Sequence, residues 1–309
     1  MTKGLIIVVM GGPSTEAEVS RRTGTEILKA LKSKGYPAEP LELDPPHFAE
    51  TILAKKPAIV FNALHGRYGE DGLMQGTLDM LGIPYTGSGV LAAAVTMDKA
   101  ATKRIFFGAG IPTPPASFFH RSEAERAIEM IKKDFSFPLV VKAVSQGSSI
   151  GVVIVEREEE LGDALKEAFR YDEEILVETF IRGRELTVAV KGTPTHAEAL
   201  PVIEIVTTTG RYDYETKYKP GASAHIVPAE LSEALTASVQ EIACEAFRIC
   251  GCKGVARVDF MLAEDDTPYA IEVNSVPGMT ETSLVPDAAR AAGQEFPELC
   301  EEILQLAGY

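Results

Sequence analysis

The stretch 254-GVARVDFMLAEDDTPYAIEVNS-275 decides the fold of the second half of the chain. Two apolar runs flank a turn rich in Glu, Asp, Thr and Pro, which is the pattern of a β-hairpin. A turn of even length centred between Asp265 and Asp266 fixes which residues of the two strands face each other. Because side chains alternate between the two faces of a strand, this register also decides which side chains share a face.

The polar side chains of the hairpin are predicted to share one face. Asp259 is expected opposite Glu272, and Arg257 opposite Asn274, at about 5 Å across the strands. The other face would carry Val258, Phe260, Ile271 and Val273. Two carboxylates and an amide oxygen this close form an oxygen site of the kind that Mg²⁺ occupies when it also carries substrate phosphates. The alternative is a solvated sheet face on which Arg257 pairs with both carboxylates.

A second stretch, 139-LVVKAVSQGSSIGVVIV-155, places Lys142 ahead of the small-residue loop 145–151. The familiar phosphate loop, GxxxxGK[ST], has its lysine after the glycines and continues into a helix. Here a second strand-like run follows, which predicts a hairpin whose tip could cover phosphates held by Lys142; a polar turn is the alternative. Together with the hairpin at 254–275, it would supply the cation and the metal that phosphoryl transfer needs.

The composition is that of a globular protein, with 45% hydrophobic and 24% charged residues among 309. A formal net charge of −15 disfavours nucleic acid as a partner, because duplex binding depends on Lys and Arg. No apolar run approaches the roughly 20 residues that span a bilayer, and no signal-peptide pattern is present, so we expect a cytoplasmic protein without a membrane partner. The four cysteines lack zinc-type spacing and are expected to be buried free thiols: Cys244, Cys250, Cys252 and Cys300.

The first part of the chain alternates strand-like and helical patterns. The predicted strands are 4–10, 38–43, 58–64 and 83–87, and the predicted helices are 16–34, 47–55 and 73–81. This alternation indicates a parallel sheet with helices on its faces. A helical run over 89–109 leads to the proline-rich stretch 111–119, where the pattern changes.

The remainder of the chain predicts two mixed units. The middle unit has strand-like runs at 137–144, 150–155 and 174–181 and helices at 122–134 and 157–170. The last unit has strands at 184–190, 196–206, 254–262 and 268–274, a helix at 230–250 and a helical tail. We therefore expect a Rossmann-like α/β domain over residues 1–110, followed by α+β domains over 111–183 and 184–309.

Eight motifs in order make the chain resemble the D-alanine–D-alanine ligase family, whose ATP-grasp fold holds ATP between two α+β domains. They are GGPSTEAEVS (11–20), NALHGRYGEDG (62–72), TMDK (96–99), KAVSQGSSIGV (142–152), VETFIRGRELTVAV (177–190), YDYETKYKPG (212–221), ARVDF (256–260) and EVNSVPGMTETSLVP (272–286). Ala17 and Ala143 depart from the family pattern, at positions whose side chains the chemistry does not need.

The resemblance implies a two-step ligation for peptidoglycan precursor synthesis, and hence a role in the cell wall and in cell shape. ATP would phosphorylate the carboxylate of one D-alanine, and the amine of a second D-alanine would attack the acyl phosphate. The products would be the dipeptide, ADP and phosphate. Two Mg²⁺ ions, or Mn²⁺ in their place, would assist. Homologues are commonly dimers, so a homodimer is expected.

The resemblance also assigns nucleotide and metal contacts. Lys99 and Lys142 would contact ATP phosphates beneath the loop that contains Ser149. Glu178 and the backbone of Phe180 and Ile181 would hold adenine, and Glu185 the ribose. Asp259, Glu272 and Asn274 would bind the two metal ions, with Glu272 between them.

The amino-acid substrates would contact a further set. Arg257 and the N–H of Gly278 would face the tetrahedral intermediate. Glu16 would bind the ammonium of the first D-alanine near His65, and Ser148 and Tyr218 would form a hydrogen-bonded triad with Glu16. Lys217 would lie near the transferred phosphate, and Ser283 and Leu284 near the carboxylate of the second D-alanine.

Plainer readings exist for single residues. Glu16 alone would be a helix-start acid favoured by the helix dipole, His65 a satisfied loop histidine, and Ser148 a turn cap. Rival functions are a D-alanine–D-lactate ligase, another ATP-grasp carboxylate–amine ligase, and a nucleotide-binding regulator without turnover. Tyr218 favours an amine as the second substrate, because the lactate-using branch usually replaces this tyrosine.

Overall fold

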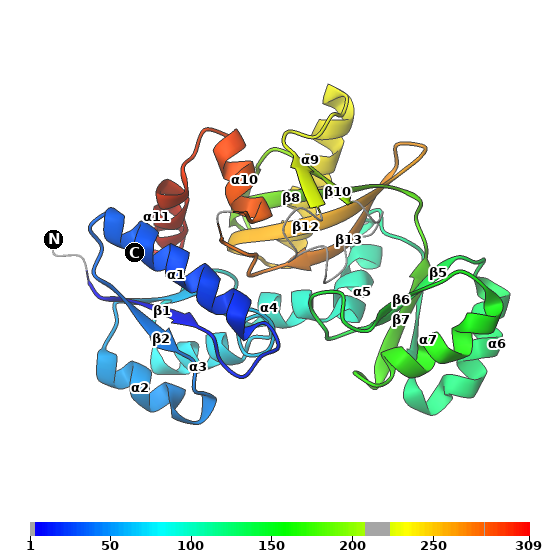
Figure 1. The fold of residues 1–309 in the computed structure, drawn as a ribbon, viewed down its shortest axis with the longest axis horizontal. Helices are drawn as coiled ribbons and strands as arrows, with labels where there is room; N and C mark the ends of the chain where they lie inside the picture. Colours follow the sequence, from blue (N-terminus) through cyan, green and yellow to red (C-terminus); the bar gives the residue numbers. More distant parts are fainter. Residues whose placement is uncertain (1–3, 208–222, 281) are drawn as a thin grey trace.

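The computed structural model describes residues 4–207, 223–280 and 282–309, which form three β-sheets (Figure 1). Within these ranges, no helix combines the length and the apolar character needed to cross a lipid bilayer. The cysteines are free thiols as predicted; Cys250, Cys252 and Cys300 are buried, and Cys244 is partly exposed.

The N-terminal sheet is parallel, as the alternating pattern predicts. Its strands are β1 (Ile6–Met10), β2 (Ala38–Glu42) and β3 (Ile59–Asn62), in the order β2-β1-β3. Its helices are α1 (Ala17–Ser33), α2 (Phe48–Lys55) and α3 (Leu73–Leu81). The predicted strand at 83–87 forms only an isolated parallel bridge between Tyr85 and Val60.

The predicted single helix at 89–109 is two helices, α4 (Val90–Met97) and α5 (Lys99–Ala109). Asp98 separates them because it adopts an extended conformation and its carboxylate accepts the N–H of Ala101 at 2.8 Å. The break places Lys99 at the start of α5, beside the loop that follows Lys142: its N–H donates to the carbonyl of Val144 at 2.8 Å.

The middle sheet is antiparallel, in the order β4-β7-β5-β6. Its strands are β4 (Ala116–His120), β5 (Leu139–Ala143), β6 (Val152–Val155) and β7 (Glu174–Thr179), and α6 (Ala124–Asp134) and α7 (Leu161–Ala168) pack on it. β5 and β6 form the predicted hairpin. The sequence reading missed β4, because the prolines before it suggested a boundary rather than a strand.

The C-terminal sheet has the order β11-β10-β8-β12-β13, with β9 paired to β8. The strands are β8 (Gly183–Thr193), β9 (His196–Ala199), β10 (Ile203–Thr207), β11 (Ser223–Ile226), β12 (Gly254–Ala263) and β13 (Pro268–Asn274). The predicted strand at 196–206 is therefore two strands, separated at Pro201, which has no N–H for a ladder. Helix α9 (Glu233–Ile249) covers one face, and α10 (Leu284–Ala291) and α11 (Phe296–Leu306) follow β13.

Short 3₁₀ turns precede three of the helices: Pro45–His47 before α2, Arg121–Glu123 before α6 and Glu158–Glu160 before α7.

The β12–β13 hairpin has the predicted register at its polar end: Arg257 pairs with Asn274 and Asp259 with Glu272. The predicted turn centre is wrong by half a residue, and a β-bulge after Asp259 absorbs the difference, so that Phe260 pairs with Ala270. Ile271, predicted on the same face as Val258, Phe260 and Val273, has no partner on β12 and is only partly buried. Ala270 is fully buried there instead.

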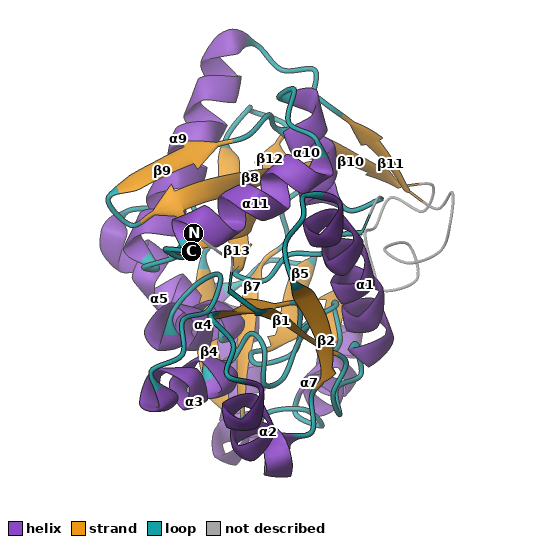
Figure 2. Ribbon diagram, turned by 90° about the vertical axis from the view of Figure 1, so that its left-hand side faces the viewer, coloured by secondary structure: helices purple, strands orange, loops and turns teal. Residues whose placement is uncertain are grey.

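The C-terminal helices return to the N-terminal sheet (Figure 2). Ile6 and Val8 of β1 share one core with Leu284 and Val285 of α10 and with Leu299, Ile303 and Leu304 near the end of the chain. The opposite face of β1 packs against α2 and α3. Polar contacts close the same interface: Lys34 pairs with Glu298 and Glu301 at 3.1 Å, and Tyr309 Oη donates to the carbonyl of Gly4. One face of the N-terminal sheet is therefore covered by α1 together with residues from the other end of the sequence.

We expect Leu304→Ala to lower the free energy of unfolding by about 2–5 kcal/mol, because the substitution leaves a cavity in this shared core. Gln305→Ala is the matched control; the side chain is exposed on the same turn of α11, and its removal should change stability by less than about 0.5 kcal/mol. Urea unfolding followed by circular dichroism measures both. Equal stability of the two variants would contradict the shared core.

Candidate active site

A cavity of about 720 Å³ lies where the three sheets meet. The predicted residues that line it come from four segments: Glu16 and His65 from the N-terminal loops, Lys99 and Ser148 from the middle of the chain, Arg257, Glu272 and Asn274 from the hairpin, and Gly278, Ser283 and Leu284 after it. Segments that are far apart in the sequence thus meet around one space.

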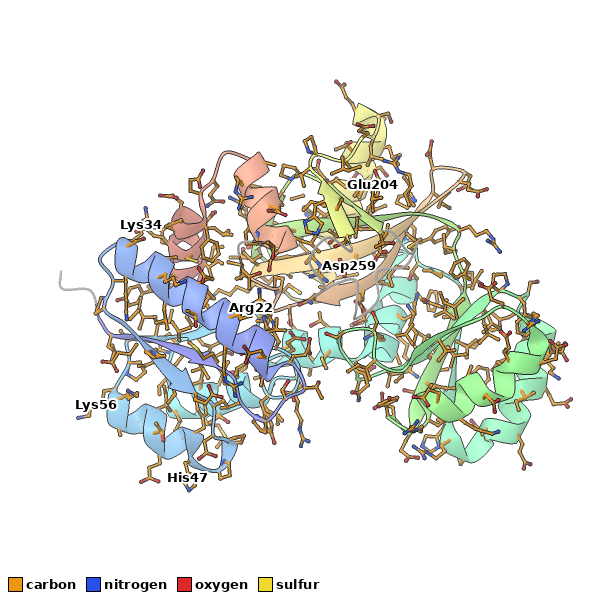
Figure 3. The ribbon with its side chains drawn as sticks, in the orientation of Figure 1. Arg22, Lys34, His47, Lys56, Glu204 and Asp259 are labelled. Atoms are coloured by element: carbon orange, nitrogen blue, oxygen red, sulfur yellow. The ribbon has the colours of Figure 1, made fainter. Side chains whose placement is uncertain are left out.

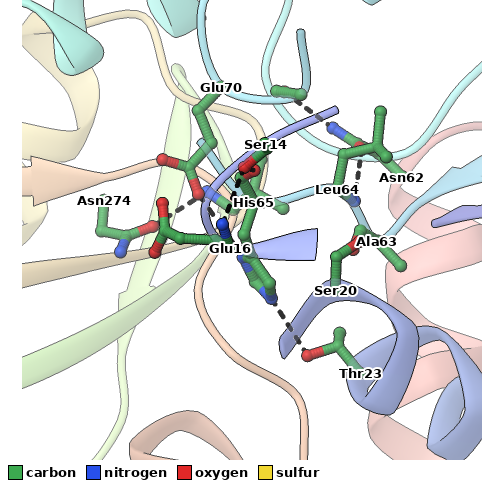
Figure 4. A network of polar contacts seen from close by, with 12 residues as sticks. Ser14, Glu16, Ser20, Thr23, Asn62, Ala63, Leu64, His65, Glu70 and Asn274 are labelled. Atoms are coloured by element: carbon green, nitrogen blue, oxygen red, sulfur yellow. Dashed lines mark hydrogen bonds and ion pairs between the residues drawn. The ribbon is translucent and has the colours of Figure 1, made fainter. Parts of the chain in front are cut away.

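Glu16 reaches across this cavity to the small-residue loop. It is the N-cap residue of α1, but its carboxylate does not cap the helix. Its N–H donates to Ser14 Oγ at 3.0 Å (Figure 4). Its carboxylate accepts a hydrogen bond from Ser148 Oγ at 2.5 Å. Glu16 therefore stands at the start of a helix, but its side chain links two loops and does not cap the helix.

The loop around Ser148 has a backbone shaped for this contact. Ser148 and Ser149 adopt left-handed conformations, with φ of 51° and 60°, which non-glycine residues rarely adopt. A Cβ on Gly66 would lie 2.8 Å from Glu16 Oε2, and a Cβ on Gly147 would lie 3.1 Å from the same atom. The Glu16 carboxylate thus sits between two glycines that leave room for it.

His65 is 5% exposed, and both of its ring nitrogens have neighbours. Nε2 lies 3.0 Å from Thr23 Oγ1, and Nδ1 lies 3.5 Å from Glu70 Oε1. Burial raises the pKa of Glu70, and His65 opposes that shift. The sequence reading did not single out Glu70, although it stands in the quoted motif HGRYGEDG and also lines the cavity near Glu16 and Asn274 (Figure 4).

The polar face of the hairpin contains ion pairs. Arg257 donates to both oxygens of Asp259, at 2.8 and 2.7 Å, and Thr187 Oγ1 donates to Asp259 at 2.6 Å. Lys99 Nζ lies 3.4 Å from Glu272 Oε2. The alternative reading, in which Arg257 pairs with the carboxylates, is thus realised for Asp259, which is not among the residues that line the cavity. Figure 3 places Asp259 on β12 and Arg22, another lining residue that the sequence reading missed, on α1.

The oxygen atoms of the hairpin suit a magnesium ion only if oxygen atoms of a bound ligand complete its coordination. Asp259 and Glu272 are cross-strand partners, and Asn274 Oδ1 accepts the N–H of Val276 at 3.2 Å. The described part of the chain contains no group of three or more His, Cys, Asp or Glu side chains arranged to hold a metal ion. Two carboxylates and an amide oxygen suit Mg²⁺ when substrate phosphates complete its coordination.

The predicted nucleotide residues other than Lys99, which lines the cavity, form a separate group. Lys142 Nζ lies 2.5 Å from Glu178 Oε1, and both side chains are buried. Lys103, which the sequence reading missed, lies 2.7 Å from the other oxygen of Glu178. It follows Lys99 by four residues on α5, a spacing that places two side chains on one face of a helix.

The other nucleotide residues lie nearby but, like Lys142 and Glu178, are not among those that line the cavity. Phe180 and Ile181 follow β7 and are partly buried; Glu185 lies on β8, and Ser149 in the β5–β6 turn. Lys217 and Tyr218 lie outside the described residues.

The segment after the hairpin turns tightly into α10. Ser283 Oγ accepts the N–H of Thr280 at 3.0 Å, and a Cβ on Gly278 would lie 3.0 Å from the same oxygen. A side chain at position 278 would therefore crowd the turn that positions Ser283 and Leu284.

Two family models and many curated proteins are similar to this chain. The family model described as D-ala D-ala ligase C-terminus matches residues 105–305, and the one described as D-ala D-ala ligase N-terminus matches residues 46–88. D-alanine–D-alanine ligase from Pelotomaculum thermopropionicum is 49% identical over 97% of this chain and 95% of its own length. The enzyme from Moorella thermoacetica is 47% identical over 98% of both chains.

Solved structures are similar to this chain over nearly its whole length. D-alanine–D-alanine ligase from Bacillus anthracis in complex with ATP superposes with a TM-score of 0.84 at 35% identity, covering 98% of this chain and 97% of that one. VanG D-Ala:D-Ser ligase from Enterococcus faecalis superposes with a TM-score of 0.85 at 27% identity, covering 99% of both chains. The chain therefore has the ATP-grasp fold and belongs to the D-alanine–D-alanine ligase family.

Proposed function

We propose that this chain joins two D-alanines to D-alanyl-D-alanine at the cost of one ATP, for the synthesis of peptidoglycan precursors. Family membership supports the reaction, and the contact between Ser148 and Glu16 is the single structural observation that carries it. This contact brings the small-residue loop and the start of α1 together at one wall of a cavity whose other wall is the carboxylate hairpin. The cavity thus joins an ammonium-binding acid to a phosphoryl-transfer site.

The reaction needs two bond exchanges. A carboxylate oxygen of the first D-alanine attacks the γ-phosphorus of ATP, and ADP leaves. The amine of the second D-alanine then attacks the acyl carbon, the C–O bond to phosphate breaks, and the amine loses a proton. Glu16 would hold the first ammonium, with His65 beside it. Arg257 and the N–H of Gly278 would donate to the oxyanion of the tetrahedral intermediate, an arrangement that typically contributes about 10²–10³ in rate per donor.

The proposed nucleotide contacts come from the middle of the chain and from the C-terminal sheet. Lys99 and Lys142 would hold phosphates under the loop that contains Ser149. Glu178 would hold adenine together with the backbone of Phe180 and Ile181, and Glu185 would hold the ribose. Asp259, Glu272 and Asn274 would hold two Mg²⁺ ions, or Mn²⁺, which neutralise charge on the phosphates when bound.

The remaining residues would contact the second D-alanine, the transferred phosphate or the side chains of the triad. Ser283 and Leu284 stand at the N-terminus of α10, where a helix favours a carboxylate. Tyr218 would complete the triad with Ser148 and Glu16, and Lys217 would approach the transferred phosphate.

We further propose domain boundaries at residues 110 and 183, a cytoplasmic location, where ATP is available, and a homodimer. An apolar patch supports the dimer. It consists of Leu73 and Met80 on α3 and Val90 and Leu91 on α4, of which Leu91 is 76% and Met80 90% exposed. The starts of the two helices approach each other, because a Cβ on Gly72, the residue before Leu73, would lie 2.8 Å from the Val90 carbonyl oxygen. Exposed apolar surface of this kind is typical of an interface between subunits.

The reaction is tested by ADP release with D-alanine. We expect ADP and phosphate to form in equal amounts with D-alanine and Mg²⁺, and no release with L-alanine. D-Lactate and D-serine, each added with D-alanine, test the second substrate. A higher rate of depsipeptide or D-alanyl-D-serine formation than of D-alanyl-D-alanine would contradict the proposal.

Glu272→Gln should lower Mg²⁺-dependent ADP formation by about 100-fold or more, because it removes a charged metal ligand. Glu264→Gln is the matched control, since Glu264 is exposed at the tip of the same hairpin and should leave the rate unchanged. Circular dichroism checks that both variants fold. Turnover close to that of the unmodified protein in Glu272→Gln would refute the metal assignment.

Leu91→Glu should convert the dimer into a monomer, because it places a charge in the apolar patch. Leu53→Glu, at a half-exposed position on α2, should leave the dimer intact. Analytical ultracentrifugation measures the mass of each variant. A monomeric unmodified protein, or a dimer that survives Leu91→Glu, would overturn this assignment.

A further inference from the structure

Lys103 is a charged side chain inside the protein, only 1% exposed, on a face of α5 that packs between the middle and C-terminal sheets. Such a lysine needs a partner, because an isolated buried ammonium is strongly disfavoured. Nothing in the proposed reaction uses it directly.

Three oxygen atoms surround the Lys103 ammonium. Nζ lies 2.7 Å from Thr113 Oγ1, 3.4 Å from the carbonyl oxygen of Pro114 and 2.7 Å from Glu178 Oε2. The ammonium donates hydrogen bonds to Thr113 and Pro114, and its contact with Glu178 is an ion pair. Thr113 Oγ1 in turn donates to the carbonyl of Ala270 on β13 at 2.7 Å, which fixes the acceptor in place.

Glu178 therefore has two lysines, one on each oxygen. Lys142 Nζ lies 2.5 Å from Oε1, and the Glu178 side chain is 3% exposed. The two partners are not equivalent. Lys142 stands next to the β5–β6 turn and is assigned to ATP phosphates in the proposed function, whereas Lys103 is held by Thr113 and Pro114. When phosphates attract Lys142, Lys103 remains as the fixed counter-charge of Glu178.

We propose that Lys103 is a positioning residue that keeps the Glu178 carboxylate ionised and oriented, so that Glu178 accepts a hydrogen bond from the 6-amino group of adenine and rejects purines with a 6-carbonyl. This inference rests on the proposed function, in which Glu178 holds adenine. An ionised carboxylate only accepts hydrogen bonds, whereas a protonated one can donate to a carbonyl. The charge state of Glu178 therefore selects between the two kinds of purine.

The surroundings of Glu178 determine what happens without Lys103. Burial raises the pKa of Glu178, but Lys142 and Lys103 outweigh it, and the pKa is lowered overall. Burial lowers the pKa of Lys103, and Glu178 opposes that shift. These two lysines are the charged groups that act on Glu178 among the described residues. Without Lys103, Lys142 alone would oppose the effect of burial, so the pKa of Glu178 would be higher than in the unmodified protein and the carboxyl would be protonated more readily as the pH falls.

The test compares Lys103→Met with Arg104→Met, a control at the adjacent, half-exposed position of α5. ATP and inosine triphosphate, which carries a carbonyl in place of the 6-amino group, serve as probes in direct binding and in ADP or IDP release. In Lys103→Met we expect the preference for ATP over inosine triphosphate to fall by about tenfold or more and to fall further as the pH is lowered. The KM for D-alanine should stay within about twofold, and Arg104→Met should match the unmodified protein.

Several outcomes overturn the proposal. One is an unchanged nucleotide preference in folded Lys103→Met, and another is an equal loss of affinity for both nucleotides, which would indicate a structural role only. If Lys103→Met does not fold, Thr113→Val, which loosens the ammonium, should lower the preference in the same direction, and an unchanged preference there refutes the proposal.

The unmodified protein supplies an independent check: its preference for ATP should be constant between about pH 5.5 and 8, and a loss towards acid pH would refute the role of Lys103. Failure of the proposed function gives a different result, namely nucleotide binding with normal selectivity but no D-alanine-dependent ADP release. Absence of ATP binding by the unmodified protein refutes both.

Discussion

The packing of α10 and α11 against the N-terminal sheet is the contact on which the rest of the structure depends. It joins residues near position 6 to residues near position 304 in one apolar core. The loops that carry Glu16 and His65 leave the N-terminal sheet at this interface, and the turn that carries Gly278 and Ser283 enters α10 there. The two sides of the cavity are therefore held by apolar contacts behind it, while the hydrogen bond from Ser148 to Glu16 joins the middle domain to the same assembly.

The opposite charges of the site pair with one another. Asp259 is paired with Arg257, Glu272 with Lys99, and Glu178 with Lys142. Buried or half-buried charges are costly when unpaired, so these pairs keep the site folded before substrates arrive. Under the proposed function, ATP and metal would exchange these partners: phosphates would compete for the lysines, and metal ions would compete for the carboxylates. Lys103 differs because it is buried and donates hydrogen bonds to Thr113 and Pro114, which hold it beside Glu178.

The polar register of the hairpin could be predicted from the sequence because side-chain alternation and a plausible turn centre are enough to pair Asp259 with Glu272. The bulge at Ile271 could not, since it follows from the detailed turn geometry beyond position 263. Strand β4 was missed because proline suggests a boundary, and the break at Asp98 because one N-cap in a helical run is a weak signal. Lys103 was missed for a different reason: lysine is usually solvent-exposed, and only three-dimensional packing places Glu178 against it.

The contact between Tyr309 and Gly4 has a consequence for synthesis on the ribosome. Strand β1 and helix α1 leave the exit tunnel before α10 and α11, so the core that these elements share stays incomplete until the last two helices have been made. At about 5–20 residues per second, the nearly 300 residues in between take roughly 15–60 seconds to add. During that time the apolar side chains Ile6 and Val8 lack their final neighbours. The early part of the nascent chain thus spends most of translation with an incomplete core, and exposed apolar surface of this kind favours aggregation.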